Sequence, residues 1–465
     1  MKTIKIPLEL QQMYKIFKEN GFEAYLVGGA VRDVLRGKNA ADWDIATNAT
    51  PEQVMAIFHK VIPTGIEHGT VTVLFKQKQF EVTTFRTEKD YTDGRHPDHV
   101  EYTSKIEEDL SRRDFTMNAI AVSLEDGKIV DPFDGKKDIQ KKIITTVGNP
   151  LDRFNEDGLR PIRAIRFASQ LGFEIKKETL EAIPLSLEKT KTISIERFRD
   201  EFCKILKSEK PSIGLNLLKD TGILNIFIPE LATCEKVEQA DCRGVHKFDV
   251  LDHLFFACDG APKDKFLVRV AALFHDIGKP ATKISKIRED GELIHTFFGH
   301  ENKSADITQE ILNRLKFPKV ESSYICHLIK NHMFHYESTW TDAAIRRFLA
   351  RVTPEAVEDL FDLRIADVYG MTNTEPCLKN SLWSQNLIEF KDRIENIESE
   401  SMALTLKDLA INGKDLIKEG FSPGKYLGMV LNELLETVLD DPNQNSYDKL
   451  LNIAINIAKK DGALI

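Results

Sequence analysis

The spacing of apolar residues predicts a mixed α/β fold for the first third of the chain. Apolar residues recur at helical spacing over residues 5–20, and AYLVGG (24–29) is typical of a strand that enters a turn. TPEQ (50–53) is a helix start signal, with threonine as the cap, proline in the first turn and glutamine at the third position. Residues 69–86 hold two alternating β-branched runs around a polar turn, which predicts a β-hairpin.

Beyond residue 150 the pattern becomes almost wholly helical. Segments 161–172, 193–206 and 213–224 carry apolar residues at helical spacing. Eight of the twelve histidines lie between residues 246 and 335, which indicates a separate unit that begins near residue 240. The last part is helical again, with a break at GFSPGKYLG (420–428). We therefore expect an α+β protein with four parts: 1–147, 148–238, 239–380 and 381–465.

Composition limits the class of protein. The 465 residues exceed one ordinary domain, and typical domain sizes give about three. No run of 18 apolar residues or signal-peptide pattern is present, so we expect no membrane span. The six cysteines form no CxxC pair, which is typical of reduced thiols in the cytoplasm. The net charge of −9 argues against binding nucleic acid over the whole surface, but it allows one basic patch.

Two acids and two glycines near the N-terminus indicate a phosphate and cation site. Asp42 and Asp44 are two residues apart, and on a strand such residues face the same side. Their carboxylates suit Mg²⁺, which prefers oxygen ligands, and Glu81 on the next predicted strand is a candidate third ligand. In the preceding segment GGAVR (28–32), glycines let backbone amides approach phosphates and arginine supplies a forked donor.

Four motifs resemble one family in their order. LVGGAVRD (26–33), DWD (42–44), RRDFTMNAIA (112–121) and EDGLRPIRAIRF (156–167) are similar to the motifs of class II tRNA nucleotidyltransferases. This bacterial-type group of the polymerase-β superfamily includes CCA-adding enzymes and poly(A) polymerases. The resemblance covers residues 22–230. It implies a polymerase-β-type nucleotidyltransferase head (1–147), a helical neck and body that binds nucleobase and tRNA (148–238), and transfer of nucleotides to an RNA 3′ end.

The resemblance also implies roles for individual residues. Asp42 and Asp44 would hold two Mg²⁺ ions, which stabilise the attacking and leaving oxygens at phosphorus, and Glu81 would assist. Asp114 would accept a hydrogen bond from the ribose 2′-hydroxyl and so select ribonucleotides. The implied nucleotide-binding residues are Gly28, Gly29, Arg32, Arg113, Asp114, Asn118, Asp157, Arg160, Arg163 and Arg166.

Asp157 and Arg160 explain how a base could be chosen without a template. Cytosine and adenine each present an amino donor beside a ring-nitrogen acceptor, whereas uracil and guanine present the reverse. An aspartate and an arginine three residues apart on one helical face would therefore pair with C or A only. Arg163 continues this face and would support Asp157 or a phosphate. Helical geometry turns Arg166 to the opposite side, and Pro161 requires the helix to begin or bend nearby.

Three related activities remain open at this point. The polar segment 86–102 resembles the flexible loop of CCA-adding and A-adding enzymes, and GIEHGTVTV (65–73) resembles the CCA-adding form. A long basic C-terminal extension, typical of the poly(A) polymerases, is missing, and DDPNQNSYDK (440–449) occurs there instead. We favour addition of CMP and AMP from CTP and ATP to tRNA. An enzyme that adds only the terminal A is the main alternative, and a poly(A) polymerase is the second.

The histidine-rich part resembles the HD superfamily of metal-dependent phosphohydrolases. The resemblance rests on HDIGKP (275–280), with LDHLFF upstream and IADVYG downstream. It implies one metal site and a second that shares Asp276, with Mg, Mn, Ni or Fe as the metal and His335 as an alternative to His332. The implied ligands are His253, His275, Asp276, His300, His332 and Asp367. The implied reaction is hydrolysis of 2′,3′-cyclic or 2′-phosphates, with Lys279 on a substrate phosphate.

Other readings of the chain carry less weight. A phosphohydrolase whose head only binds RNA would not need Asp42 and Asp44, and no additional segment indicates a nucleotide-sensing regulator. The tail from residue 381 resembles the helical end of HD-containing members. Its lysines Lys414 and Lys425, with Arg346 and Arg347, are candidates for a tRNA-binding strip. DNA and membranes are not expected partners.

Overall fold

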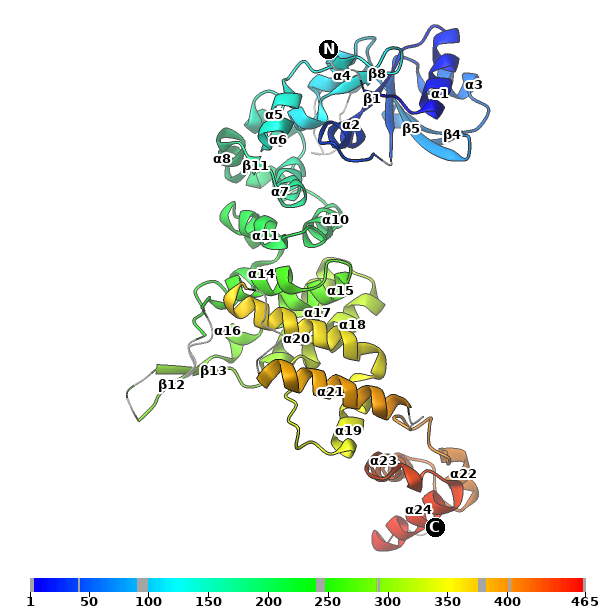
Figure 1. The fold of residues 1–465 in the computed structure, drawn as a ribbon, viewed down its shortest axis with the longest axis vertical. Coiled ribbons are helices and arrows are strands. Elements are labelled where there is room, and N and C mark those ends of the chain that lie inside the picture. The colour runs from blue at the N-terminus through cyan, green and yellow to red at the C-terminus, as the bar shows by residue number, and fades with distance from the viewer. Residues whose placement is uncertain are drawn as a thin grey trace. The chain divides into compact units, whose positions relative to one another are not determined.

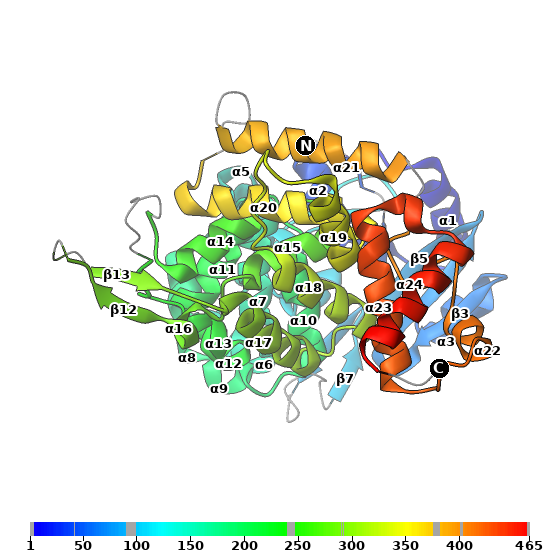
Figure 2. The same ribbon diagram turned by 90° about the horizontal axis from the view of Figure 1, so that it is seen from below.

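The computed structural model describes residues 4–40, 42–89, 99–239, 247–289, 291, 293–374, 382–399 and 403–462. The chain divides into two compact units, namely Met1–Thr233 with Arg314–Lys316, and Cys234–Asn313 with Phe317–Ile465. The first unit carries a mixed sheet and the second is almost wholly helical (Figures 1 and 2). Among the described residues, no helix has both the length and the apolar character needed to cross a membrane.

A seven-stranded sheet forms the head of the first unit. Its order is β3-β4-β5-β2-β1-β8-β9, with β2 parallel to β5 and all other neighbours antiparallel. This arrangement confirms the predicted mixed sheet. The strands are β1 (Ala24–Val27), β2 (Asp44–Thr47), β3 (Val61–Gly65), β4 (Thr70–Phe75), β5 (Lys78–Thr84), β8 (Ala121–Ser123) and β9 (Ile129–Val130).

Several predicted elements of the head are present. The amphipathic segment forms α1 (Leu8–Glu19), which buries Met13 and Phe17, and the Phe17 ring lies 5.0 Å from that of Phe58, centroid to centroid. α3 (Pro51–Ile57) begins with the expected capping box of Thr50 and Gln53. β4 and β5 form the predicted hairpin, and their turn places two adjacent non-glycine residues, 76 and 77, in the left-handed region.

The head differs from the prediction in two places. The glycine pair does not form a turn, because α2 (Gly28–Leu35) begins directly after β1. Segment 86–102 is not a loop throughout: β6 (Arg86–Lys89) pairs with β7 (His99–Tyr102) as an antiparallel ribbon. Residues 90–98, the middle of the predicted flexible loop, lie outside the described residues.

Helices continue the first unit beyond the head. Segments 161–172 and 193–206 form the predicted helices α7 and α10. Segment 213–224 is divided, because α11 ends at Asp220 and α12 begins at Ile223, after Gly222 in the left-handed region. α7 packs on both α10 and α11. A two-stranded parallel pairing of β10 (Ile143–Ile144) with β11 (Glu174–Ile175) was not expected. The helices are α4 (Ile106–Ser111), α5 (Gly135–Lys141), α6 (Pro150–Glu156), α7 (Arg160–Leu171), α8 (Lys177–Leu185), α9 (Leu187–Thr190), α10 (Ile195–Leu206), α11 (Pro211–Asp220), α12 (Ile223–Phe227) and α13 (Pro229–Ala232).

The second unit is built on helices that pack closely. Gly370 lets α20 approach α14, because a Cβ at this position would lie 2.7 Å from the backbone oxygen of His253. A hairpin of β12 (Ile284–Ile287) and β13 (Leu293–Thr296) projects from the helices, and the sequence analysis missed it (Figures 1 and 2). The helices are α14 (Val250–Gly260), α15 (Phe266–Phe274), α16 (Lys279–Thr282), α17 (His300–Arg314), α18 (Lys319–Asn331), α19 (Asp342–Val352) and α20 (Val357–Thr372).

The end of the second unit is helical, as predicted. α21 (Leu382–Ser399) is anchored by Phe390, whose ring stacks on Tyr336 with centroids 4.4 Å apart. Three further helices, α22 (Gly413–Lys418), α23 (Lys425–Asp440) and α24 (Tyr447–Lys460), share a core that includes Val430, Leu434 and Leu450. The break expected over 420–428 ends earlier, because α23 begins at Lys425.

Candidate functional site

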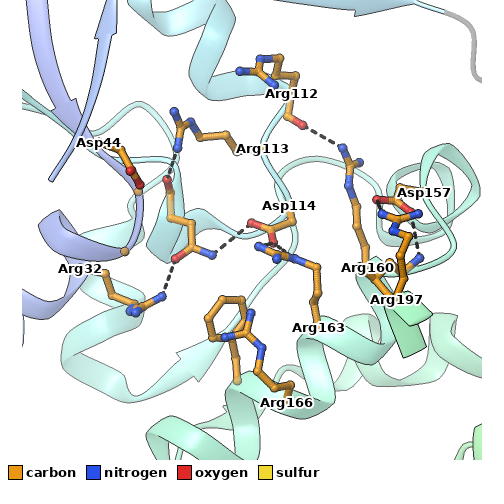
Figure 3. Close-up of a pocket in the computed structure, with 15 residues that line it drawn as sticks. Arg32, Asp44, Arg112, Arg113, Asp114, Asp157, Arg160, Arg163, Arg166 and Arg197 are labelled. Atoms are coloured by element: carbon orange, nitrogen blue, oxygen red, sulfur yellow. Dashed lines mark hydrogen bonds and ion pairs between the residues drawn. The ribbon is translucent and has the colours of Figure 1, made fainter. Parts of the chain in front are cut away.

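A pocket of about 530 Å³ in the first unit, called the nucleotide pocket below, gathers residues from the head and from α7 and α10. Seven arginines and three aspartates line it, so its charge is strongly positive in a chain of negative net charge. A polyanion suits such a pocket because charge-assisted hydrogen bonds from arginine are strong. Its lining residues are Gly28, Gly29, Arg32, Asp44, Arg112, Arg113, Asp114, Asn118, Asp157, Leu159, Arg160, Arg163, Arg166, Phe167 and Arg197 (Figure 3).

Gly28 is required by the geometry at the junction of β1 and α2. Its φ is +76°, and an added Cβ would lie 3.0 Å from Oδ2 of Asp44. A side chain would therefore meet both backbone strain and the carboxylate. Gly29 is less restricted, since an added Cβ would lie 3.5 Å from the Arg32 guanidinium.

The predicted acid cluster is only partly as expected. β2 begins at Asp44, so the prediction that Asp42 lies on the same strand is wrong; Asp42 precedes the strand in a bend. Glu81 lies on β5 as predicted, in register with Asp44. Burial, Glu81 and Asp42 raise the pKa of Asp44, whereas Arg113 opposes this shift. Part of this shift therefore comes from the negative charge of Glu81 and Asp42, and such charge suits a divalent cation.

The three acids do not yet converge on one point. Among the described residues, no group of three or more ligand atoms within 4.8 Å of one another includes Asp42, Asp44 or Glu81. Asp42 lies beside Trp43 in a separate hollow, and Asp44 alone of the three lines the nucleotide pocket. Ionised carboxylates repel each other, and a bound cation would allow the three acids to come closer together.

A hydrogen-bonded chain joins the head to α7. Arg32 donates to the side-chain oxygen of Asn118 (3.0 Å), and the Asn118 amide donates to Asp114 (3.1 Å). Asp114 also accepts hydrogen bonds from its neighbouring amide of Phe115 (2.8 Å) and from Nε of Arg163 (2.8 Å). Burial raises the pKa of Asp114, but Arg163 and Asn118 outweigh it and lower this pKa to about 2. Asp114 is therefore a fixed anion in the pocket.

Asp157 and Arg160 do not share a helical face, contrary to the prediction. α6 ends at Glu156, Asp157 is extended, and α7 begins at Arg160 with Pro161 in its first turn. A proline favours such a start because it lacks an amide donor. Both residues nevertheless line the pocket. Asp157 accepts a hydrogen bond from Arg197 (2.8 Å), and Arg160 donates to the backbone oxygen of Arg112 (3.1 Å).

Arg163 and Arg166 both reach the pocket from α7. Arg163 pairs with Asp114 and not with Asp157, the partner that we considered. Arg166 was expected on the opposite side relative to Asp157, but the break before α7 removes the premise of one continuous helix. Arg166 is buried, pairs with Glu201 (2.7 Å) and lies over the Phe167 ring at 3.6 Å from its centroid.

Four lining residues were not predicted from the sequence: Arg112, Leu159, Phe167 and Arg197. Three of them lie inside motifs that we quoted, so their neighbours were the available signal. Arg197 lies on α10, and only tertiary packing brings it to Asp157.

A second candidate site lies in the second unit, where buried histidines and aspartates converge from separate helices. Nε2 of His253 and Nε2 of His275 lie 3.2 Å apart, and each lies 3.3–3.5 Å from Oδ1 of Asp367. Nε2 of His300 lies 3.1 Å from Oδ1 of Asp276, and Nε2 of His332 lies 3.7 Å from it. The ligand atoms form two groups, His253, His275, Asp276 and Asp367, and Asp276, His300 and His332.

Backbone carbonyls orient three of these rings. Nδ1 of His275, His300 and His332 lies 2.7–2.8 Å from the backbone oxygens of residues 272, 297 and 329, respectively. A ring that donates from Nδ1 presents Nε2 as a metal ligand, which is the usual arrangement in metal sites. The buried Oδ1 of Asp276 and Nε2 of His300 lie 3.1 Å apart, but neither makes a hydrogen bond among the described residues. The donor set therefore fits two divalent metals.

Lys279 and His335 have different surroundings. Lys279 is buried, with Nζ 2.5 Å from Oδ2 of Asp276 and 2.7 Å from Oε1 of Gln239. Burial raises the pKa of Asp276, but Lys279 and His275 hold it well below its usual range. His335 is exposed and lies outside both groups, so it is not an alternative to His332 in this arrangement.

Both arginines of the predicted tRNA-binding strip have partners within the chain. Arg346 is buried and donates to the backbone oxygens of residues 439 and 440 at the end of α23, and Arg347 pairs with Glu436 and Asp440. Lys414 and Lys425 are exposed. The two arginines therefore fasten α19 to α23.

Gly28→Ala tests whether the close approach of the Gly28 backbone to the Asp44 carboxylate is needed for binding. We expect nucleoside triphosphate affinity to fall at least tenfold, because the methyl group displaces the carboxylate. Gly21→Ala is the matched control, since its φ is +80° and nothing lies within 4 Å of the added Cβ. Calorimetric titration and melting temperatures would show similar backbone strain in both variants but a binding loss in Gly28→Ala alone. Equal affinity in both would contradict the role of Gly28.

Asp114→Asn tests the linkage between head and α7. Because the folded-state pKa is lowered to about 2, the charge contributes stability above about pH 4 that is lost as the pH falls towards 2. We expect a loss of about 2 kcal/mol in unfolding free energy at pH 7, with the difference shrinking in acid. In a Trp340→Phe, Trp383→Phe background, Trp43 fluorescence would follow urea unfolding of this unit. A pH-independent difference would argue against the ionised contact.

Family comparisons agree with this architecture. Residues 24–145 match the family "Poly A polymerase head domain", residues 172–234 match "Probable RNA and SrmB- binding site of polymerase A", and residues 243–372 match "HD domain". These matches fall on the head, on the helices that follow it and on the histidine-rich unit.

Whole-chain relatives are CCA-adding enzymes. The chain is 34% identical over 456 residues to that of Lactobacillus helveticus (strain DPC 4571), covering 97% of this chain and 98% of the relative. It is 36% identical over 447 residues to that of Pediococcus pentosaceus, covering 96% of each. The crystal structure of Bacillus stearothermophilus CCA-adding enzyme in complex with CTP aligns over 99% of both chains, with a TM-score of 0.74 and 30% identity. The chain belongs to the CCA-adding enzyme family, whose members are nucleotidyltransferases, and it carries an HD domain.

Proposed function

We propose that this chain transfers CMP and then AMP from CTP and ATP to the 3′ end of tRNA, without a template and with release of pyrophosphate. The nucleotide pocket carries the proposal, because it places seven arginines beside Asp44 and the pair Asp157 and Arg160. A solved relative at 30% identity has CTP bound, which supports the same substrate class. The cytoplasm is the proposed compartment, since Cys203, Cys234, Cys258 and Cys326 are thiols and not disulfides.

The triphosphate and ribose would lie on the head side of the pocket. Arg32 and Arg113 offer donors to phosphate oxygens, and Gly28 and Gly29 allow a close approach at the start of α2. Asp114, anchored by Arg163 and Asn118, retains lone pairs for a ribose hydroxyl. These contacts orient the α-phosphate towards Asp44.

Asp42, Asp44 and Glu81 are the proposed holders of Mg²⁺. The ions, when bound, would offset charge on the triphosphate and on the departing pyrophosphate. Burial first, and then repulsion from Glu81 and Asp42, raise the pKa of Asp44, and bound cations would relieve the repulsive part. Asp42 lies in a bend before the strand, so its carboxylate would need to turn towards Asp44.

Asp157 and Arg160 are the proposed readers of the base. Arg197 and Arg112 hold these two side chains at the pocket wall, one by an ion pair and one through its backbone oxygen. An acceptor beside a donor matches the Watson–Crick edges of C and A. U and G would leave these polar groups unmatched, which disfavours them strongly.

One assay tests this function and its alternatives. Purified protein would receive tRNA ending at the discriminator, at C or at CC, with labelled CTP, ATP, UTP and GTP. We expect CCA on the first, completion of the others, and no product from UTP or GTP. A single A on the CC form only would identify an A-adding enzyme, and long A tails on arbitrary RNA would identify a poly(A) polymerase.

Asp44→Asn is the matched loss-of-function variant for that assay. We expect incorporation to fall at least a thousandfold while the melting temperature without metal stays equal or rises, because one repulsive charge is removed. Mg²⁺ should raise the melting temperature of the wild type more than that of the variant. Full incorporation by Asp44→Asn would refute the assignment of the acids.

A second activity is proposed for the HD domain, namely hydrolysis of 2′,3′-cyclic or 2′-phosphate esters. The two buried groups of histidines and aspartates that share Asp276 carry this proposal. Metals held there, of which Mg, Mn, Ni and Fe are the candidates, would supply an activated water. Lys279 at the edge of the cluster would position a phosphate oxygen.

Asp276→Ala would remove the one carboxylate that both groups share. We expect bound metal, measured by elemental analysis, to be lost, and hydrolysis of 2′,3′-cyclic AMP to fall at least a thousandfold. CCA addition should be unaffected. His335→Ala, an exposed histidine outside both groups, should retain metal and hydrolysis. If Asp276→Ala keeps its metal, the assignment of the ligands fails.

A further inference from the structure

A single row of side chains crosses the head sheet, starting at the nucleotide pocket. Strand pairing aligns Asp44 on β2 with Glu81 on β5, Glu81 with Thr72 on β4, and Thr72 with Ile62 on β3. Residues aligned in this way share one face of a sheet, and neighbouring strands lie about 4.8 Å apart. Thr72 is therefore about 10 Å from Asp44 across the sheet, and Ile62 about 15 Å.

This row lies on the accessible face of the sheet. The alternate residues of β4 and β5, including Val71, Val73 and Val82, are buried on the opposite face. Glu81 is exposed, Thr72 is half-buried, and 44% of Ile62 is exposed. A ligand can therefore reach the row from solvent.

The geometry of nucleotide transfer indicates from which side of Asp44 the RNA 3′ end approaches. Asp44 lines the nucleotide pocket, but Glu81, Thr72 and Ile62 do not. In an in-line displacement the attacking oxygen and the leaving pyrophosphate lie on opposite sides of phosphorus. With the triphosphate among the arginines, the RNA 3′-hydroxyl must approach from the other side of Asp44, where the row begins.

We propose that Thr72, Thr64 and Ile62, the acceptor patch, bind the last nucleotide of the RNA that is being extended. This inference rests on the proposed nucleotide transfer and adds to it the surface that holds the acceptor end. The hydroxyls of Thr64 and Thr72 lie 3.0 Å apart, and either can donate to the other. The pair therefore retains both a donor and an acceptor for a ligand.

The neutral character of the acceptor patch indicates which part of the RNA it binds. Two hydroxyls and an exposed isoleucine suit a ribose and the face of a base, whereas a phosphate would require cations. A ribose 2′-hydroxyl is the group by which proteins distinguish RNA from DNA. The acceptor patch therefore selects an RNA end over a DNA end.

Thr72→Val removes the hydroxyl and keeps both shape and strand preference. The substrates are tRNAs whose terminal nucleotide carries either a 2′-hydroxyl or a 2′-hydrogen. We expect the KM of the ribose-ended tRNA to rise about five- to tenfold, which corresponds to one hydrogen bond, with the KM of CTP unchanged. The wild type should prefer the ribose end, and the variant should lose that preference.

Thr70→Val is the matched control. Thr70 lies on the same strand and face, but its hydroxyl pairs with Thr83 at 3.0 Å, one row further from Ile62. An equal effect of both substitutions, or an unchanged preference in Thr72→Val, would overturn the proposal.

Titration of both RNAs without nucleotide provides a test that does not need transfer. If Thr72→Val alone loses the preference for the ribose end, this result supports the acceptor patch, whether or not the wild type incorporates nucleotide. Absence of incorporation by the wild type would refute the proposed function and not the acceptor patch. Equal affinity of the wild type for the two ends would overturn the acceptor patch while leaving transfer itself intact.

Discussion

The structure of the first unit depends on compensating the positive charge of the seven arginines that line the nucleotide pocket. Like charges at this density repel unless each is compensated, so the pocket is stable only because carboxylates lie behind the guanidinium groups. Arg112 and Arg113 pair with Asp109, Arg163 with Asp114, and Arg166 with Glu201. The pKa of Asp109, Asp114 and Glu201 is lowered despite burial, because the arginines face them.

The same pairs determine how the head and α7 fit together. Asp114 belongs to the head and Arg163 to α7, so their ion pair connects the head to α7 across the pocket. The hydrogen bond from Arg160 to the backbone oxygen of Arg112 is a second connection between α7 and the head. Because the proposed substrate binding and the packing of the head on α7 use the same charges, we expect substitutions at these positions to affect both. Separating the two effects requires a stability measurement beside every activity measurement.

Motifs identified most residues of both candidate sites, but they did not predict where the helices and strands that hold these residues begin and end. Periodicity gave α1, β4, β5 and α7 because these elements bury one regular face. It failed at EDGLRP, where Pro161 starts a new helix and leaves Asp157 extended. It also failed at Asp42, because a period of two cannot show where a strand begins. Arg197 and Arg346 depend on tertiary partners, for which a single sequence holds no local signal.

The HD cluster shows what spacing alone can and cannot determine. His332 and His335 are equivalent candidates in sequence, yet one is buried with Nδ1 at a carbonyl and the other is exposed. Burial decides between them, since a ligand needs its ring orientation fixed.

The negative net charge of the chain favours binding of a polyanion at the positive pocket over binding elsewhere on the surface. With a net charge of −9, most of the surface does not attract a polyanion, so nucleic acid gains binding energy where arginines are concentrated. The proposed acceptor patch, which begins about 10 Å across the sheet from Asp44, would contribute through shape and hydroxyl groups, which do not weaken with salt as phosphate contacts do. Salt should therefore weaken binding of the triphosphate far more than recognition of the terminal ribose. In the proposed reaction, such a division would let one site hold an anionic nucleotide tightly while the RNA end moves after each addition.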